Sequence, residues 1–239
     1  MEGNKLKVGV FADGYIDQFG VSTAQKMVQF LQKLGVETVM PPQPTGSGME
    51  MYFNGDTQGA FERGDALIAA FRGVNCVVCT SSGVVAYMRR HLSGLFAQSA
   101  LHAESVKLGN KFVDICDFLV NGMHFDASGI TFPYKVAWVD HGRTLRDYGM
   151  KAEPRQLLRQ VANLDLVEAG ELDMDFFFAS DFTPVAVALL DEVIDRAVAQ
   201  NAHYLCAGEP SLILLLNGRL EKRGLKLKCR HIVDILCQN

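Results

Sequence analysis

The chain has 239 residues, 49% of them hydrophobic and 21% charged, with a formal net charge of −4 at pH 7. This length suits one large domain or two of about 120 residues, with a substantial core. The negative charge and the lack of a basic block exclude nucleic acid as an expected partner. The run SLILLL (211–216) is far shorter than the ~20 residues of a membrane span, and the opening residues contain no signal-peptide core. We therefore expect a cytoplasmic protein without a membrane span.

The six cysteines are scattered along the chain without the spacing of a disulfide framework, as is usual in a reducing compartment. Cys76 and Cys79 have the C-x-x-C spacing found in redox and metal sites. They lie in the apolar run NCVVC, which predicts a buried strand, and residues three apart on a strand point to opposite faces. We therefore interpret both as core residues and expect no shared metal ion.

Strand and helix signals alternate along the first half. An apolar strand at 5–11 precedes a polar turn and a helix at 22–35, which Gly35 ends. A short strand at 37–40 leads into the loop PPQPTGSGM (41–49). The remaining predicted elements are a helix at 57–71, a strand at 76–80, a helix at 83–92, and one long helix or a pair over 95–122.

The second half repeats this order. KVGVFADG (7–14) and KVAWVDHG (135–142) match without a gap at an offset of 128 residues. Further elements of the second half are predicted as helix 154–162, strand 164–168, loop 171–182, helix 185–200, strand 203–207, helix 211–224, strand 225–229 and a short helix at 231–238.

A repeat of this length indicates duplicated domains, predicted at 1–130 and 131–239. Alternating strands and helices indicate an α/β fold, with a small parallel sheet flanked by helices in each of two pseudo-symmetric halves. In such sheets the functional residues gather in the loops that follow the carboxyl ends of the strands.

The order of these segments and their amino-acid sequences resemble those of the cysteine-rich (CCG) domain family over essentially the whole chain. The best-kept stretches are the opening strand and turn, QKLGVETVMPPQ, KVAWVDHG with LRDYG, and NGRLEKRG running on to HIVDIL. Within that family the chain is similar to lactate-utilisation protein A, an iron–sulfur subunit of a lactate oxidation system, and to the CCG-bearing subunit of heterodisulfide reductase. The resemblance implies three cysteine-bearing loops in each half, whose thiolates hold an iron–sulfur cluster.

None of the positions that the resemblance assigns to the cluster is a cysteine in this chain. They are Gly14, Gly46, Ser47 and Val84 in the first half, and Gly142, Asp175, Phe176 and Leu212 in the second. Cys79 and Cys206 fall a few residues early, inside predicted strands. Glycine, valine, leucine and phenylalanine have no side-chain donor, so we expect a degenerate iron–sulfur site with no cofactor and no metal.

The first-half loops carry small residues, so we expect a cleft there that could hold a small anionic ligand. Its candidate ligand-binding residues are Asp13, Gly14, Gly46, Ser47, Gly48, Ser81 and Ser82. The alternative is loop shortening around water. In the second half the larger Phe176 and Leu212 predict a filled pocket that packs as core.

The most polar loop, VDHGRTLRD (139–147), supplies the candidate catalytic residues Asp140, His141 and Arg143. A histidine between an acid and an arginine could act as a general base. A surface ion-pair cluster or a docking patch for a partner subunit is the favoured alternative. For His231 we expect a helix-start or packing role.

We expect a homologue of the iron–sulfur subunit of a lactate or glycolate oxidation system that has lost its cluster and is not an enzyme by itself. It would be a structural, regulatory or small-ligand-binding protein, with partner subunits of such a complex or with further copies of itself. One alternative is an enzyme of new specificity that uses the Asp140/His141/Arg143 loop or the first-half cleft. Another is an electron-transfer subunit with an unrecognised cofactor.

Overall fold

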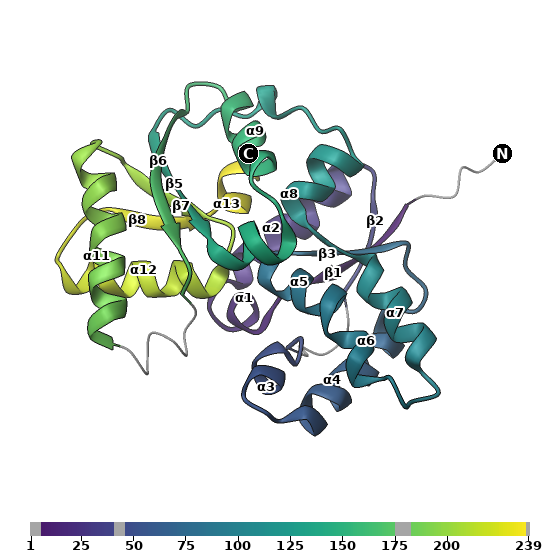
Figure 1. The fold of residues 1–239 in the computed structure, drawn as a ribbon. Coiled ribbons are helices and arrows are strands. Elements are labelled where there is room, and N and C mark those ends of the chain that lie inside the picture. Colours follow the sequence, from purple (N-terminus) through teal and green to yellow (C-terminus); the bar gives the residue numbers. More distant parts are fainter. Residues whose placement is uncertain (1–5, 41–45, 175–182, 238–239) are drawn as a thin grey trace. The chain divides into compact units, whose positions relative to one another are not determined.

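The computed structural model describes residues 6–40, 46–174 and 183–237. The chain forms two compact units, Met1–Phe118 and Leu119–Asn239 (Figure 1). The sequence prediction places the boundary between the two domains at residues 130 and 131. Ile130 is bonded within the second unit, where its carbonyl accepts a hydrogen bond from the Ala162 amide at 2.8 Å.

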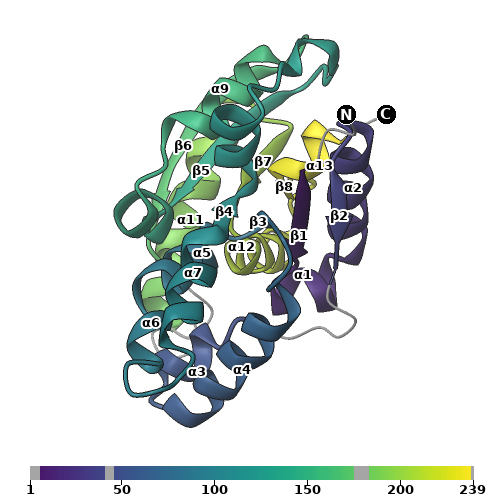
Figure 2. The same ribbon diagram turned by 90° about the vertical axis from the view of Figure 1, so that its right-hand side faces the viewer.

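Unit 1 contains a four-stranded parallel sheet in the order β2-β1-β3-β4. Its strands are β1 (Lys7–Phe11), β2 (Glu37–Val39), β3 (Cys76–Cys79) and β4 (Phe112–Asp114). Its helices are α1 (Gly14–Phe19), α2 (Val21–Lys33), α3 (Met49–Phe53), α4 (Thr57–Ala70), α5 (Ser82–Arg90), α6 (Leu92–Leu95), α7 (His102–Lys111) and α8 (Ile115–Asp117). Figure 2 shows α3, α4, α6 and α7 grouped together within this unit.

The prediction of one or two helices over 95–122 is wrong at its centre, where β4 interrupts the helical segments. Phe112 and Val113 pair with Val77 and Val78 of β3. This pairing completes the edge of the sheet and buries Phe112 fully, so the tertiary contact prevails over the local helical pattern.

Unit 2 contains a second four-stranded parallel sheet, in the order β6-β5-β7-β8. Its strands are β5 (Lys135–His141), β6 (Asp165–Leu172), β7 (Tyr204–Ala207) and β8 (Lys228–His231). Its helices are α9 (Ala152–Gln160), α11 (Thr183–Ala199), α12 (Pro210–Lys222) and α13 (Ile232–Leu236). Single helical turns occur at η1 (Phe118–Gly122), η2 (Ala127–Gly129) and η3 (Thr144–Tyr148).

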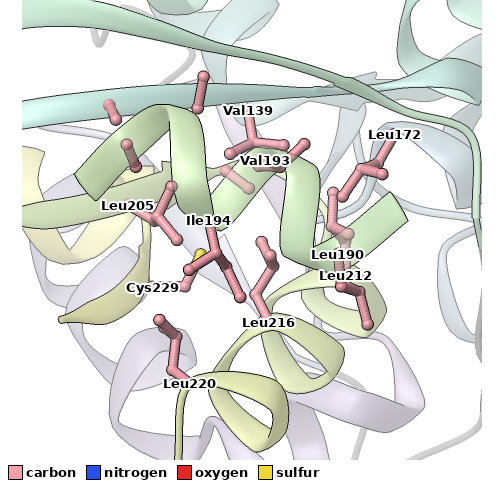
Figure 3. Packing of buried hydrophobic residues seen from close by; sticks show 14 of the residues in the cluster. Val139, Leu172, Leu190, Val193, Ile194, Leu205, Leu212, Leu216, Leu220 and Cys229 are labelled. Atoms are coloured by element: carbon pink, nitrogen blue, oxygen red, sulfur yellow. The ribbon is translucent and has the colours of Figure 1, made fainter. Parts of the chain in front are cut away.

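The core of unit 2 lies between one face of its sheet and helices α11 and α12. Alternate residues of β5, such as Val139, point to this face and meet Ile194 of α11 and Leu216 of α12 (Figure 3). Each large apolar side chain buried here contributes roughly 1.5–3 kcal/mol of stability.

In both units the first strand pairs with the second and with the third in equivalent registers, at an offset of 128 residues. Lys7 pairs with Glu37 in unit 1, and Lys135 pairs with Asp165 in unit 2. The amide of Lys7 donates to Asn75 Oδ1 at 2.9 Å, while that of Lys135 donates to His203 Nδ1 at 3.0 Å. The same strand order and the same local bonds in both units confirm the predicted pseudo-symmetric α/β duplication.

The core of unit 1 centres on three phenylalanine rings. Phe11, Phe71 and Phe112 lie with their ring centroids 5.6–6.4 Å apart in edge-on contacts, the geometry that aromatic pairs prefer. Gly9 of β1 leaves the space that the Phe71 ring fills, since a Cβ there would lie 2.5 Å from Phe71 Cδ1.

None of the described helices combines the length and apolar character that a bilayer-spanning segment needs.

Candidate functional site

At the carboxyl end of β1, Asp13 and Gly14 begin helix α1. Asp13 is buried and acts as the N-cap residue, with its Oδ1 accepting the Ile16 amide at 2.9 Å. Gly14 is the first helical residue, and a Cβ built there would have no heavy atom within 4 Å. The carboxylate therefore has a structural task, and the space around Gly14 is open.

The turn Gly46–Ser47–Gly48 leads into helix α3. Ser47 is buried, and its Oγ accepts the Met49 amide at 3.2 Å. Gly48 has a φ of +82°, and a Cβ there would lie 3.2 Å from Ala60 Cα of α4. Glycine is required here because the backbone is left-handed and α4 passes close by. Gly46, in contrast, has open space around it.

Ser81 and Ser82 follow β3 and begin helix α5. Ser81 caps the helix, with its Oγ accepting the Val84 amide at 3.1 Å. Ser82 donates its hydroxyl to Oδ2 of Asp114 at 2.8 Å, and both serines are fully buried. The predicted cleft residues of unit 1 thus lie in the loops after β1 and β3 and in the turn before α3, with their described side chains bonded to nearby protein groups.

Asp114 is a buried acid at the end of β4 that the sequence interpretation did not single out. Burial raises the pKa of its carboxyl to about 6, although hydrogen bonds from Ser82 and Cys116 oppose the shift. The internal repeat could have indicated this residue, because Asp114 is the last residue of β4 and His231 is the last residue of the equivalent strand β8. Each caps the following short helix: Asp114 Oδ1 accepts the Cys116 amide at 2.7 Å, and His231 Nδ1 accepts the Val233 amide at 3.1 Å.

Asp140 and His141 are the last two residues of β5 and not loop residues. Both are buried, and as neighbours on a strand they point to opposite faces of the sheet. His141 Nε2 lies 3.2 Å from the carbonyl oxygen of Met174. Arg143 follows in the turn that enters η3. This geometry does not bring the Asp140 carboxylate and the His141 ring together as an acid–base pair.

The Asp140 carboxylate is bound by Arg155 of α9. Arg155 Nη1 and Nη2 donate to its two oxygens at 3.0 and 2.6 Å, and Trp138 Nε1 donates to Oδ1 at 2.7 Å. The same guanidinium donates to both oxygens of Glu168 on β6, at 2.8 and 2.7 Å. Arg155 therefore joins α9 to two strands, as its planar set of donors allows. No short sequence motif indicates this network, because Glu168 and Asp140 lie 13 and 15 residues from Arg155 along the chain.

Gly142 lies beside an exposed ion-pair group in which Arg146 contacts Glu171 and Asp173. A Cβ at Gly142 would collide with the Arg146 guanidinium and the Asp173 carboxylate. Both contacts are made by the ends of exposed, flexible side chains, which would have to move to admit a larger residue at this position.

The third-loop positions are packed core in both units. Val84 of α5 is 2% exposed, and Leu212 of α12 is completely buried beside Leu190 and Leu216 (Figure 3). Asp175 and Phe176 lie outside the described residues. Neither aliphatic side chain has a donor atom, so these positions do not fit an iron–sulfur cluster.

The cysteines lie elsewhere, and none of the six forms a disulfide. Cys79 of β3 and Cys206 of β7 are fully buried within their strands. Burial and the nearby Cys229 raise the pKa of Cys206 well above its ordinary value, and burial raises the pKa of Cys76 to about 11. Thiols in such surroundings are protonated when no metal ion is bound and are weak nucleophiles. In the described ranges no three His, Cys, Asp or Glu side chains are grouped closely enough to share a metal ion.

The fold and these loops define a duplicated parallel α/β protein with polar groups at the carboxyl edges of its sheets. Along nearly its whole length the chain is similar to lactate utilization protein A. It is 25% identical to the protein of Geobacillus thermodenitrificans over 97% of this chain and 98% of the relative. For the Macrococcus caseolyticus protein the identity is 27%, over 97% and 96% of the two chains.

No family model matches the chain. Among solved structures, glutamate racemase isoform RacE1 of Bacillus anthracis aligns with a TM-score of 0.41 and 12% identity, over 98% of this chain and 79% of that one. Glutamate racemase of Francisella tularensis aligns with a TM-score of 0.37 and 13% identity, over 98% and 78%.

Proposed function

We propose that this chain is a lactate-utilisation protein whose family cluster site has lost its thiolate ligands. The observation that carries the lactate connection is the similarity to lactate utilization protein A over 97% of the chain. A match from end to end, rather than over one motif, means that both units and their connecting segment are shared with these relatives.

The cluster-less part of the proposal rests on the residues that replace the implied cysteines. Gly14 and Gly46 leave open space, Val84 and Leu212 are buried in the core, and the ion-paired side chains of Arg146 and Asp173 lie beside Gly142. Cys206 and Cys229 are buried in strands β7 and β8, and in the described ranges no three His, Cys, Asp or Glu side chains are grouped closely enough to share a metal ion, which supports this part of the proposal.

The role that fits these features is that of a non-catalytic structural, regulatory or small-ligand-binding protein that acts beside a lactate- or glycolate-oxidising system. The binding of Asp140 by Arg155 supports a structural rather than a general-base task for that carboxylate. A small anion at the open positions Gly14 and Gly46 remains part of the proposal.

Two measurements test the proposal separately. Protein purified without oxygen should be colourless, with far less than one iron and one inorganic sulfide per chain. Stoichiometric iron and sulfide would contradict the loss of the cluster.

A strain of the native cell that lacks the gene should grow poorly on lactate and normally on glucose, and the intact gene should restore growth. Normal growth of the deletion strain on lactate would contradict the lactate connection. A tagged copy expressed in the complemented strain should retain partner subunits on purification, because a non-catalytic member must act through other proteins.

A further inference from the structure

A small cavity lies in unit 1 between the end of α4 and helix α7. Its floor is formed by Ile68, Phe71 and Leu108, which are 3%, 0% and 4% exposed. Its volume is about 60 Å³, which is room for about four water-sized groups. The floor is firmly held, because the Phe71 ring is packed against Phe11 and Phe112 of the sheet.

The rim of the cavity carries an excess of positive charge. Arg72, Lys107 and Lys111 line it together with one carboxylate, Glu104. Lys111 Nζ donates to the Arg72 carbonyl at 3.2 Å and so ties α7 to the end of α4. Within the described part of the chain, neither Arg72 nor Lys107 forms an ion pair, so both charges are available at the rim.

We propose that this cavity binds a small organic carboxylate with a short hydrocarbon part. The carboxylate would bind to Arg72 and Lys107, and the hydrocarbon part would lie against Phe71 and Leu108. An arginine presents paired donors that match the two oxygens of a carboxylate. An apolar floor favours a hydrocarbon group, whereas a fully hydrated inorganic anion would lose water contacts there without replacement.

This site is separate from the loops that follow the carboxyl ends of the strands. Arg72 precedes β3 and Lys111 directly precedes β4, so the cavity lies toward the opposite, amino-terminal end of these strands. The proposal rests on the cavity alone and not on the proposed lactate connection.

The test is a titration of the ¹⁵N-labelled full chain with propionate, followed by amide chemical shifts. Saturable shifts are expected at Phe71, Arg72, Leu108 and Lys111. Propionamide has the same shape without the charge, and inorganic phosphate has charge without the hydrocarbon part. Both should bind at least tenfold more weakly than propionate.

Variants with unchanged packing locate the site. The exposed pair Arg72→Gln and Lys107→Gln together should weaken propionate binding at least tenfold. The matched pair Lys222→Gln and Lys226→Gln removes the same charge from exposed positions in unit 2 and should leave the affinity unchanged. Glu104→Gln should strengthen binding, because it removes the one carboxylate from the rim.

Four results would overturn the proposal. These are an absence of saturable shifts, shifts that saturate elsewhere in the chain, equal binding of propionamide or phosphate, and equal weakening by the two double variants.

Discussion

The hydroxyl of Ser82 donates to the carboxylate of Asp114 across 2.8 Å, and both side chains are almost completely shielded from water. The pair joins the start of α5 to the end of β4, at the edge of the sheet where α/β proteins place functional groups. Because the pKa of Asp114 is raised to about 6, this carboxyl changes charge within a range that cells and experiments reach.

The stability of unit 1 should therefore fall as the pH rises from about 4 to about 6. In the unfolded chain Asp114 loses its proton near its ordinary pKa of about 4, while the folded chain holds the proton up to about pH 6. Over that interval the unfolded state binds fewer protons, so folding becomes less favourable, by about 3 kcal/mol in total from this group.

Asp114→Asn isolates this effect, because asparagine keeps the shape and cannot ionise. The stability of the variant minus that of the natural protein should grow by about 3 kcal/mol between pH 4 and pH 7, measured by urea unfolding followed by circular dichroism. A constant difference would show that Asp114 keeps an ordinary pKa. Ser82→Ala removes a hydrogen bond that lowers this pKa, so it should move the transition to higher pH.

The fold class was predictable because the pattern of strands and helices occurs twice along the chain. The Lys-Val strand opening occurs twice at the same offset, and both copies have the pairing that the repeat implies. Strand β4 was not found, because its three residues follow α7 without a turn residue and their strand conformation depends on pairing with β3. A comparison of the residues around Asp114 with those around His231, at the equivalent place in the second unit, would have located strand β4.

The candidate site was predictable in position and less so in contacts. Asp13, Ser47 and Ser81 lie in the expected loops or turns, and Ser82 is the first residue of α5. Turn and cap residues of this kind are recognisable locally. The binding of Asp140 by Arg155 was not predictable, because it depends on how α9 lies across the sheet. A strand that extends to His141 also separates two side chains that look adjacent in the sequence.

Removal of the Asp140 carboxylate should destabilise unit 2 strongly. Asp140→Ala leaves the buried guanidinium of Arg155 with Glu168 as its remaining carboxylate and deprives the Trp138 indole of its acceptor. Loss of one partner from a buried ion pair costs about 3 kcal/mol or more.

The fluorescence of Trp138 reports this directly, since it is the one tryptophan of the chain and lies in the affected network. The urea midpoint should fall clearly for Asp140→Ala and stay unchanged for Arg146→Ala, whose ion pairs are exposed. Equal midpoints for Asp140→Ala and the natural protein would contradict a structural role for this carboxylate.

Tyr87→Phe should stabilise unit 1. Tyr87 is 1% exposed, and among the described residues its hydroxyl has no hydrogen-bond partner. A buried hydroxyl without a partner costs about 1 kcal/mol or more. Phenylalanine keeps the ring contacts with Tyr52 and Phe53, whose centroids lie 5.6 and 6.2 Å away.

Thermal unfolding followed by circular dichroism would measure the gain. Tyr204→Phe is the matched control, because the Tyr204 hydroxyl lies 3.5 Å from Arg230 Nη2 and its removal should bring no gain. A loss of stability in Tyr87→Phe would mean that the hydroxyl is satisfied in solution.

Gly9→Ala should destabilise unit 1 by forcing the Phe71 ring out of its place. The added Cβ would lie 2.5 and 2.7 Å from two atoms of a ring that is fully buried and cannot swing into solvent. Overpacking of this kind costs about 1–3 kcal/mol. Gly73→Ala is the control, since a Cβ there meets no atom within 4 Å, and it should leave the unfolding midpoint nearly unchanged.

A double-mutant cycle tests whether the Phe71 ring is the group that the new Cβ displaces. Phe71→Leu, which replaces the ring by a smaller side chain, should cost less stability in the Gly9→Ala background than in the natural protein. Additive losses would show that the two side chains do not compete for this space.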